Sequence, residues 1–132
     1  MENRQSPKGS ILIVDDEPSI SFLLSEILTT EGFDCQSCSS GQEALTLLQE
    51  KDFDIVISDL QMPGMTGLEL LAVVHAKYPH TAFLILTGVD DFRVGVQAMK
   101  HGGADYVAKP FRIDTIVPTV ERALETKRLE LG

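Results

Sequence analysis

Residues 11–16 of this 132-residue chain read ILIVDD, four apolar residues followed directly by two acids. A second run, DIVIS at 54–58, is followed by Asp59, and a third, AFLIL at 82–86, is followed by Thr87. Near-continuous apolar runs of this length are typical of strands that are buried on both faces of a parallel sheet. In such sheets ligands bind at the carboxyl ends of the strands, so the polar residues after each run mark a candidate site.

The rest of the chain alternates between short β-rich runs and longer segments with helical spacing. We predict strands at Ile11–Val14, Phe33–Cys38, Asp54–Ser58, Ala82–Leu86 and Asp105–Ala108. We predict helices from Pro18 to the stop at Gly32, and over about Gly41–Lys51, Gly67–Tyr78, Phe92–His101 and Asp114–Leu129. Five strands alternating with five helices predict an α/β fold, a doubly wound parallel sheet covered on both faces. If Asp114 caps the last helix, Pro118 forfeits only the first intrahelical hydrogen bond.

Composition narrows the class of protein. The net charge of −9, from 20 acidic and 11 basic residues, argues against direct nucleic-acid binding, which needs clustered Lys and Arg. No apolar run approaches the ~20 residues of a membrane-spanning helix, and the N-terminus lacks a secretory apolar region. We therefore expect a cytoplasmic protein with no membrane contact. We divide the chain into a disordered leader at 1–9, one domain at 10–129 and a tail at 130–132.

The two cysteines, Cys35 and Cys38, form a C-x-x-C motif within a predicted strand. Residues three apart on a strand point to opposite faces, with Cα atoms ~10 Å apart, which is too far for a disulfide. The chain offers no second Cys/His pair to complete a zinc site. We therefore expect buried or half-buried free thiols.

The polar residues at the predicted strand ends form a chemically coherent set: Asp15, Asp16, Asp59, Thr87 and Lys109. Clustered carboxylates repel one another, and a divalent cation is the usual remedy. Oxygen ligands without His or Cys favour Mg²⁺. A carboxylate can attack phosphorus to give an aspartyl phosphate, which a metal and a lysine would stabilise. Taken singly, each feature also suits an ordinary turn or helix cap, but their shared position at strand ends is not required by turn chemistry.

These motifs resemble the receiver domain of response regulators, the aspartate-phosphorylated halves of two-component systems. The resemblance rests on VDDEP at 14–18, SDLQMPGMTG at 58–67, LTG at 86–88 and KPF at 109–111, and it covers roughly residues 10–128. It implies a flavodoxin-like fold with strand order 2-1-3-4-5. It also implies a phosphorylation-controlled switch rather than a turnover enzyme.

The resemblance assigns roles to individual residues. Asp59 matches the phosphoacceptor. Asp15 and Asp16 match the acidic pair that holds Mg²⁺, or Mn²⁺ in its place, with Asp16 the more direct ligand and Asp15 acting largely through water. The backbone carbonyl of Gln61 matches the last metal ligand from the protein.

Other positions match the family's switch. Thr87 would bond the phosphoryl group and Lys109 would neutralise it. Tyr106 matches the aromatic residue whose ring turns inward as Thr87 moves, and Pro110 matches a proline that commonly follows a cis bond. Phosphorylation would then shift the surface formed by the fourth helix, fifth strand and fifth helix, through which dimers are common in the family.

The resemblance implies a histidine kinase or phosphotransfer protein as phosphodonor and an output domain or partner as target. The charged helical end, residues 121–132, favours a piece cut from a longer regulator over a stand-alone receiver. Three alternatives are weaker. A haloacid-dehalogenase-like phosphatase or phosphotransferase would need D-x-D after the first strand, a flavodoxin-like cofactor binder would need a Ser/Thr/Gly-rich loop there, and a degenerate receiver would lack some of these residue types.

Overall fold

The computed structural model describes residues 7–88, 93, 96–97, 100, 105–109 and 111–131. Its strands form one parallel sheet in the order β2-β1-β3-β4-β5, which confirms the predicted topology. The strands are β1 Ser10–Val14, β2 Asp34–Cys38, β3 Ile55–Asp59, β4 Ala82–Thr87 and β5 Asp105–Ala108.

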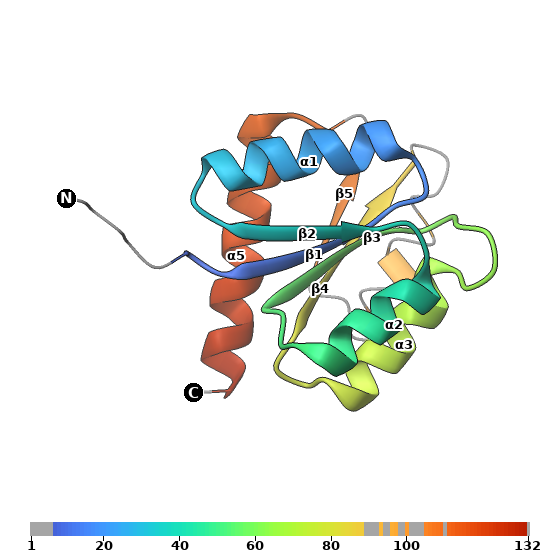
Figure 1. Ribbon diagram of the computed structural model, residues 1–132. Coiled ribbons are helices and arrows are strands. Elements are labelled where there is room, and N and C mark those ends of the chain that lie inside the picture. The colour runs from blue at the N-terminus through green and yellow to red at the C-terminus, as the bar shows by residue number, and fades with distance from the viewer. Residues whose placement is uncertain are drawn as a thin grey trace.

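Helices cover both faces of this sheet (Figure 1). They are α1 Pro18–Thr30, α2 Gly41–Glu50, α3 Gly67–Lys77 and α5 Ile113–Leu131. Helix α1 and helix α5 lie on one face, and α2 and α3 lie on the other (Figure 1). Arg93, Val96, Gln97 and Lys100 are helical, and the remainder of the helix predicted over 92–101 lies outside the described residues.

Two hydrophobic clusters fill the space between the sheet and its helices. Along β1, Ile11 and Ile13 face α1 and α5, whereas Leu12 and Val14 face α2 and α3, and all four are fully buried. Side chains alternate between the two faces of a strand, so a strand between two helical layers must be apolar at every position. The continuous run ILIV therefore encodes a central strand, as predicted.

Several predicted boundaries differ from the structure by one or two residues. Asp59 and Thr87 are the last residues of β3 and β4 rather than the first residues after them. Helix α5 starts at Ile113, because the carbonyl of Arg112 already accepts the N–H groups of Thr115 and Ile116 at 3.0 and 2.8 Å. Asp114 therefore lies in the first turn of α5 and is not its cap. Its side chain instead receives a hydrogen bond from Arg112 at 2.9 Å.

Pro118 consequently lies inside the helix rather than in its first turn. Because proline lacks an N–H, the carbonyl of Asp114 receives no helical hydrogen bond from it. Pro118 is exposed, so water can reach this part of the helix.

The two cysteines are free and half-buried, as predicted. Cys35 packs against the cluster under α1 and α5, and Cys38 packs against the cluster under α2 and α3. They therefore lie on opposite faces of β2, as expected for residues three apart. Burial raises the pKa of the Cys38 thiol to about 11, so it is mostly protonated at neutral pH.

Of the predicted leader, residues 1–6 lie outside the described residues. The backbone N–H of Lys8 donates to the carbonyl of Gly32 at 2.9 Å. The carbonyl of Lys8 accepts a hydrogen bond from the Arg128 side chain at 3.1 Å. Its ammonium lies 3.3 Å from Glu121 on α5. Lys8 thus joins the start of β2 to α5. Within the described residues, no helix combines the length and apolar character that a membrane span requires.

Gly67 connects the fold to the strand end that carries Asp59. It begins α3 after Thr66, whose hydroxyl accepts the Glu69 N–H at 3.2 Å in a reciprocal capping box. The Gly67 N–H donates to the carbonyl of Leu60 at 2.9 Å. A Cβ at this position would collide with the Asp59 carbonyl and lie 2.9 Å from the Leu60 Cα atom. The backbone approach leaves no room for a side chain.

We predict that Gly67→Ala lowers the free energy of unfolding by about 2–3 kcal/mol, because the backbone atoms of β3 cannot move aside cheaply. Urea unfolding followed by circular dichroism measures this change. Gly9→Ala is the matched control, since its added methyl would meet the end of the Asp54 side chain at 3.2 Å instead of backbone. Equal losses for the two variants would contradict the prediction.

Candidate functional site

The carboxyl ends of four strands bring together the residues expected there from the sequence. Asp15 follows β1, Asp59 ends β3, Thr87 ends β4 and Lys109 follows β5. The parallel register places Asp59 opposite Leu86, one residue before Thr87. These strands share one direction, so their ends meet at the same edge of the sheet.

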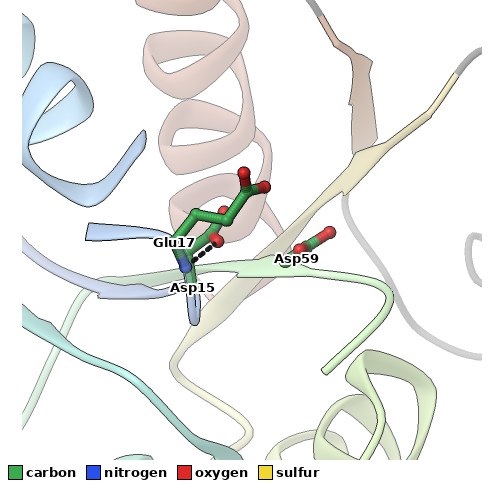
Figure 2. A group of neighbouring side chains, drawn as sticks. All are labelled: Asp15, Glu17 and Asp59. Atoms are coloured by element: carbon green, nitrogen blue, oxygen red, sulfur yellow. Dashed lines mark hydrogen bonds between the residues drawn. The ribbon is translucent and has the colours of Figure 1, made fainter. Parts of the chain in front are cut away.

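Strand alternation decides which of these side chains point the same way. Asp15 continues the row of Ile11 and Ile13, and Asp59 continues the row of Ile55 and Ile57, all four of which pack toward α1 and α5. Because every second residue shares a face, the two carboxylates lie on the same side of the sheet edge. Figure 2 shows Asp15 at the end of β1 and Asp59 at the end of β3.

Lys109 is the cation of this site. Its ammonium nitrogen lies 3.3 Å from Asp59 Oδ2, 3.5 Å from Asp15 Oδ2 and 3.7 Å from Glu17 Oε1. Burial lowers the pKa of Lys109, but the carboxylates of Asp15, Asp59 and Glu17 more than offset this and raise it overall. Lys109 therefore stays charged and faces three acids, which leaves an excess of negative charge in the pocket.

Asp15 is the most constrained of the acids, with a side chain that is 0% exposed. Its Oδ1 atom accepts the backbone N–H of Glu17 at 2.9 Å (Figure 2). Its Oδ2 atom has no hydrogen-bond partner among the described residues, only the ion pair with Lys109. Burial raises the pKa of Asp15, and the hydrogen bond from Glu17 and the charge of Lys109 reduce this rise without cancelling it. Ionisation of Asp15 in the folded domain therefore lowers the free energy of unfolding.

The pocket suits a divalent cation. One carboxylate oxygen from each of Asp15, Glu17 and Asp59 lies within 4.8 Å of the other two. Figure 2 shows the Glu17 side chain beside Asp15, and Asp59 on the neighbouring strand. Hard oxygen ligands and surplus negative charge favour Mg²⁺. The buried Asp15 Oδ2, which lacks a hydrogen bond, is an oxygen that such an ion or its water would satisfy.

Of the predicted ligands, Asp16 has an exposed side chain and does not belong to this carboxylate group. The ligand predicted from Gln61 is its backbone carbonyl, which a group of side chains does not include. Glu17 does belong to it, although the sequence reasoning gave it no role. The sequence does contain a signal for Glu17, because it is the third acid of the run Asp15-Asp16-Glu17 and lies within the motif VDDEP.

Thr87 and Tyr106 lie toward the other face of the sheet. Ile85 and Tyr106 are register partners, and both pack with the cluster under α2 and α3. Thr87 is two residues beyond Ile85 on β4 and is 1% exposed. The Lys109 N–H donates to the Thr87 carbonyl at 2.7 Å, which connects this pair to the pocket. Pro110 and its predicted cis bond lie outside the described residues.

This structure defines a doubly wound α/β domain with an acidic, cation-compatible pocket at the carboxyl edge of its sheet. Residues 11–121 match the family model of the response regulator receiver domain. The chain therefore belongs to the response regulator receiver domain family.

Individual relatives agree with this assignment. The chain is 40% identical over 117 residues to the DNA-binding transcriptional regulator NtrC of Klebsiella pneumoniae, covering 89% of this chain and 25% of the relative. A receiver domain protein from Clostridium thermocellum has a TM-score of 0.85 at 32% identity, with 91% of this chain and 97% of that chain covered. NtrX from Brucella abortus has a TM-score of 0.88 at 31% identity, with 92% and 28% covered.

The chain thus spans about a quarter of the length of the curated regulators it matches. Receiver domains are phosphorylation-controlled switches of two-component systems, they are generally Mg²⁺-dependent, and they interact with histidine kinases. The family match does not favour the alternative of an aspartyl-nucleophile phosphatase or phosphotransferase.

We predict that Asp15→Asn raises the free energy of unfolding by about 1 kcal/mol at neutral pH without divalent cations, because it removes a buried charge. The pKa of Asp15 is raised above 3.8 in the folded state. The wild type is therefore stabilised by this group at acidic pH and loses that stability as pH rises through the folded pKa. The gain from Asp15→Asn should accordingly grow from acidic to neutral pH.

Urea unfolding at several pH values measures this difference. Asp16→Asn removes an equal charge from the neighbouring exposed residue and should change stability little. An Asp15→Asn variant that is less stable than wild type at neutral pH would refute this account of Asp15.

Proposed function

We propose that Asp59 accepts a phosphoryl group from a histidine kinase or phosphotransfer protein in a Mg²⁺-dependent reaction. The observation that carries this proposal is the Asp59 carboxylate at the end of β3, 10% exposed, with the Lys109 ammonium at 3.3 Å and buried Asp15 beside it. A carboxylate oxygen of Asp59 forms the new bond to phosphorus while the bond from phosphorus to the donor imidazole nitrogen breaks. The imidazole leaves with the electron pair of that bond.

The pocket has two tasks in this step. Asp59 must approach an anionic phosphoryl group, so the repulsion between them must be reduced. Lys109 contributes one positive charge at the reacting oxygen. Asp15, Asp16, Asp59 and the carbonyl of Gln61 would hold Mg²⁺, or Mn²⁺ in its place. When bound, this ion would supply the remaining neutralisation and a fixed position for the phosphoryl oxygens.

Once Asp59 is modified, its negative charge lies farther from β3, on the phosphoryl oxygens. We expect Lys109 to follow that charge, because its ammonium is shared among acids and is committed to none of them. Thr87 ends the neighbouring strand and can donate its hydroxyl to a phosphoryl oxygen. The domain catalyses only its own phosphorylation and dephosphorylation.

A docking surface for the phosphodonor lies beside the pocket. A groove of about 390 Å³ is lined by Asp15, Pro18, Ser21 and Phe22, among others. Phe22 is 68% exposed and Leu23 is 47% exposed on the same helix. Exposed apolar side chains next to reacting groups suit a partner protein that covers the site during transfer. Free thiols fit the proposed cytoplasmic location, since reducing compartments preserve them.

We predict that acetyl phosphate or beryllofluoride with Mg²⁺ forms one adduct per chain, at Asp59. Intact mass and peptide mapping would locate the phosphoryl adduct, and the Asp59→Asn variant should show none, because an amide is a poor nucleophile toward phosphorus. Asp54→Asn is a matched control, since Asp54 precedes the same strand and bonds Ser10 at its opposite end. An adduct that persists in Asp59→Asn would show that another residue is the acceptor.

The proposed output runs through Thr87 and Tyr106 to the surface of the fourth helix, β5 and α5. Both side chains lie on the α2/α3 side of the sheet, where Tyr106 adjoins Ile85. The hydrogen bond from Lys109 to the Thr87 carbonyl fixes the end of β4 to the residue that responds to the phosphoryl charge. A shift of Thr87 toward the phosphate would leave space that the Tyr106 ring can enter. An output domain or a second copy of the chain could then bind the changed surface.

We predict that beryllofluoride shifts the amide resonances of β5 and α5 by much more than those of the β2 edge. Heteronuclear NMR spectra with and without beryllofluoride would measure this. Thr87→Val should keep the adduct but lose most of the shift at β5, because it removes the hydroxyl and preserves the volume. Full shifts in that variant would exclude the hydroxyl from the switch.

A further inference from the structure

Glu17 occupies a position that usually serves the helix. It is the N-cap residue of α1, with extended backbone angles, and its carbonyl accepts the N–H groups of Ile20 and Ser21. N-cap side chains commonly accept a hydrogen bond from the first turn. The Glu17 side chain makes no such bond. The charge of Glu17 suits the start of a helix, but its carboxylate is not held there by a cap hydrogen bond.

The Glu17 carboxylate instead lies over the pocket. It is 62% exposed and 3.7 Å from the Lys109 ammonium, whereas the side chains of Asp15 and Asp59 are 0% and 10% exposed. Its backbone N–H donates to Asp15 Oδ1, so the main chain that carries Glu17 is fixed to the buried acid. Figure 2 shows the Glu17 side chain next to the Asp15 carboxylate.

A second observation points to a ligand rather than to a surface cluster of acids. Asp15 Oδ2 is buried and aimed into the pocket, and it has no hydrogen-bond partner among the described residues. Among the described residues, Lys109 is the one cation paired with these three acids. With these groups ionised, the four side chains carry two surplus negative charges, which matches the charge of one divalent cation.

We propose that Glu17 is a further acid of the cation site, beside Asp15, Asp16 and Asp59, and that it raises the affinity of the pocket for a hydrated divalent cation. This inference rests on the proposed function, because it concerns the same Mg²⁺ site. Glu17 attracts the ion from the exposed side and accepts hydrogen bonds from the ion's water shell, which Mg²⁺ gives up reluctantly. In the absence of the ion, Glu17 shares Lys109 with Asp15 and Asp59.

The test is a Mg²⁺ titration of the unphosphorylated chain, followed by the amide resonances around Asp59. We expect Glu17→Gln to raise the dissociation constant for Mg²⁺ about three- to tenfold. This is the effect of removing one charge near a dication at a solvated site. Glu26→Gln is the matched control, because it removes the same charge from an exposed position on α1. Glu17→Asp should recover most of the affinity, and added salt should shrink the difference between Glu17→Gln and wild type.

Equal affinities for Glu17→Gln and Glu26→Gln would overturn the inference and leave the proposed function standing. A wild-type chain that binds no Mg²⁺ would overturn both. If Glu17→Gln failed to fold, Glu17→Asp and Glu17→Lys would test the inference instead. The affinity for Mg²⁺ should then fall from wild type to Glu17→Asp to Glu17→Lys. Any other order would overturn the inference.

Discussion

The Lys109 ammonium, shared among three carboxylates, is the interaction on which this structure depends. Asp15 and Asp59 lie side by side because two parallel strands end at the same level, and like charges so placed repel one another. The same ammonium lies within 3.3–3.7 Å of the acids, and its backbone N–H is bonded to Thr87. One residue thereby connects the charge balance of the pocket to the end of β4. A buried charge that is incompletely neutralised lowers the stability of the domain, and it lies at the site where the function needs that charge.

The sequence allowed most of the fold to be predicted, because a strand between two helical layers must be apolar at every position. ILIV at 11–14 is such a run, and the resemblance to receiver domains implied the order of the strands in the sheet. The convergence of Asp15, Asp59 and Lys109 was predictable from strand ends alone. The position of Glu17 was not, since an acid before Pro18 suits a helix start equally well and only the direction of its side chain separates the two. Helix α5 begins one residue before the predicted Asp114, because the Arg112 carbonyl accepts the first N–H groups of the helix.

The site is divided between the two faces of the sheet. Asp15 and Asp59 extend rows that face α1 and α5, whereas Thr87 and Tyr106 belong to the side of α2 and α3. The effect of a charge added at Asp59 must therefore reach Thr87 and Tyr106 through the ends of β4 and β5. The Lys109–Thr87 hydrogen bond provides such a route, and it is short at 2.7 Å. Binding and response can thus be altered separately by substitutions on different faces.

The two cysteines of β2 place one thiol in each of these layers. Cys35 reports on the packing of α1 and α5, and Cys38 on that of α2, from a strand that forms the edge of the sheet. With the pKa of Cys38 at about 11, its thiolate is scarce at neutral pH, so labelling should be slow unless that side of the edge opens. The chain consequently contains its own pair of chemical reporters, which can follow the two helical layers independently in one sample.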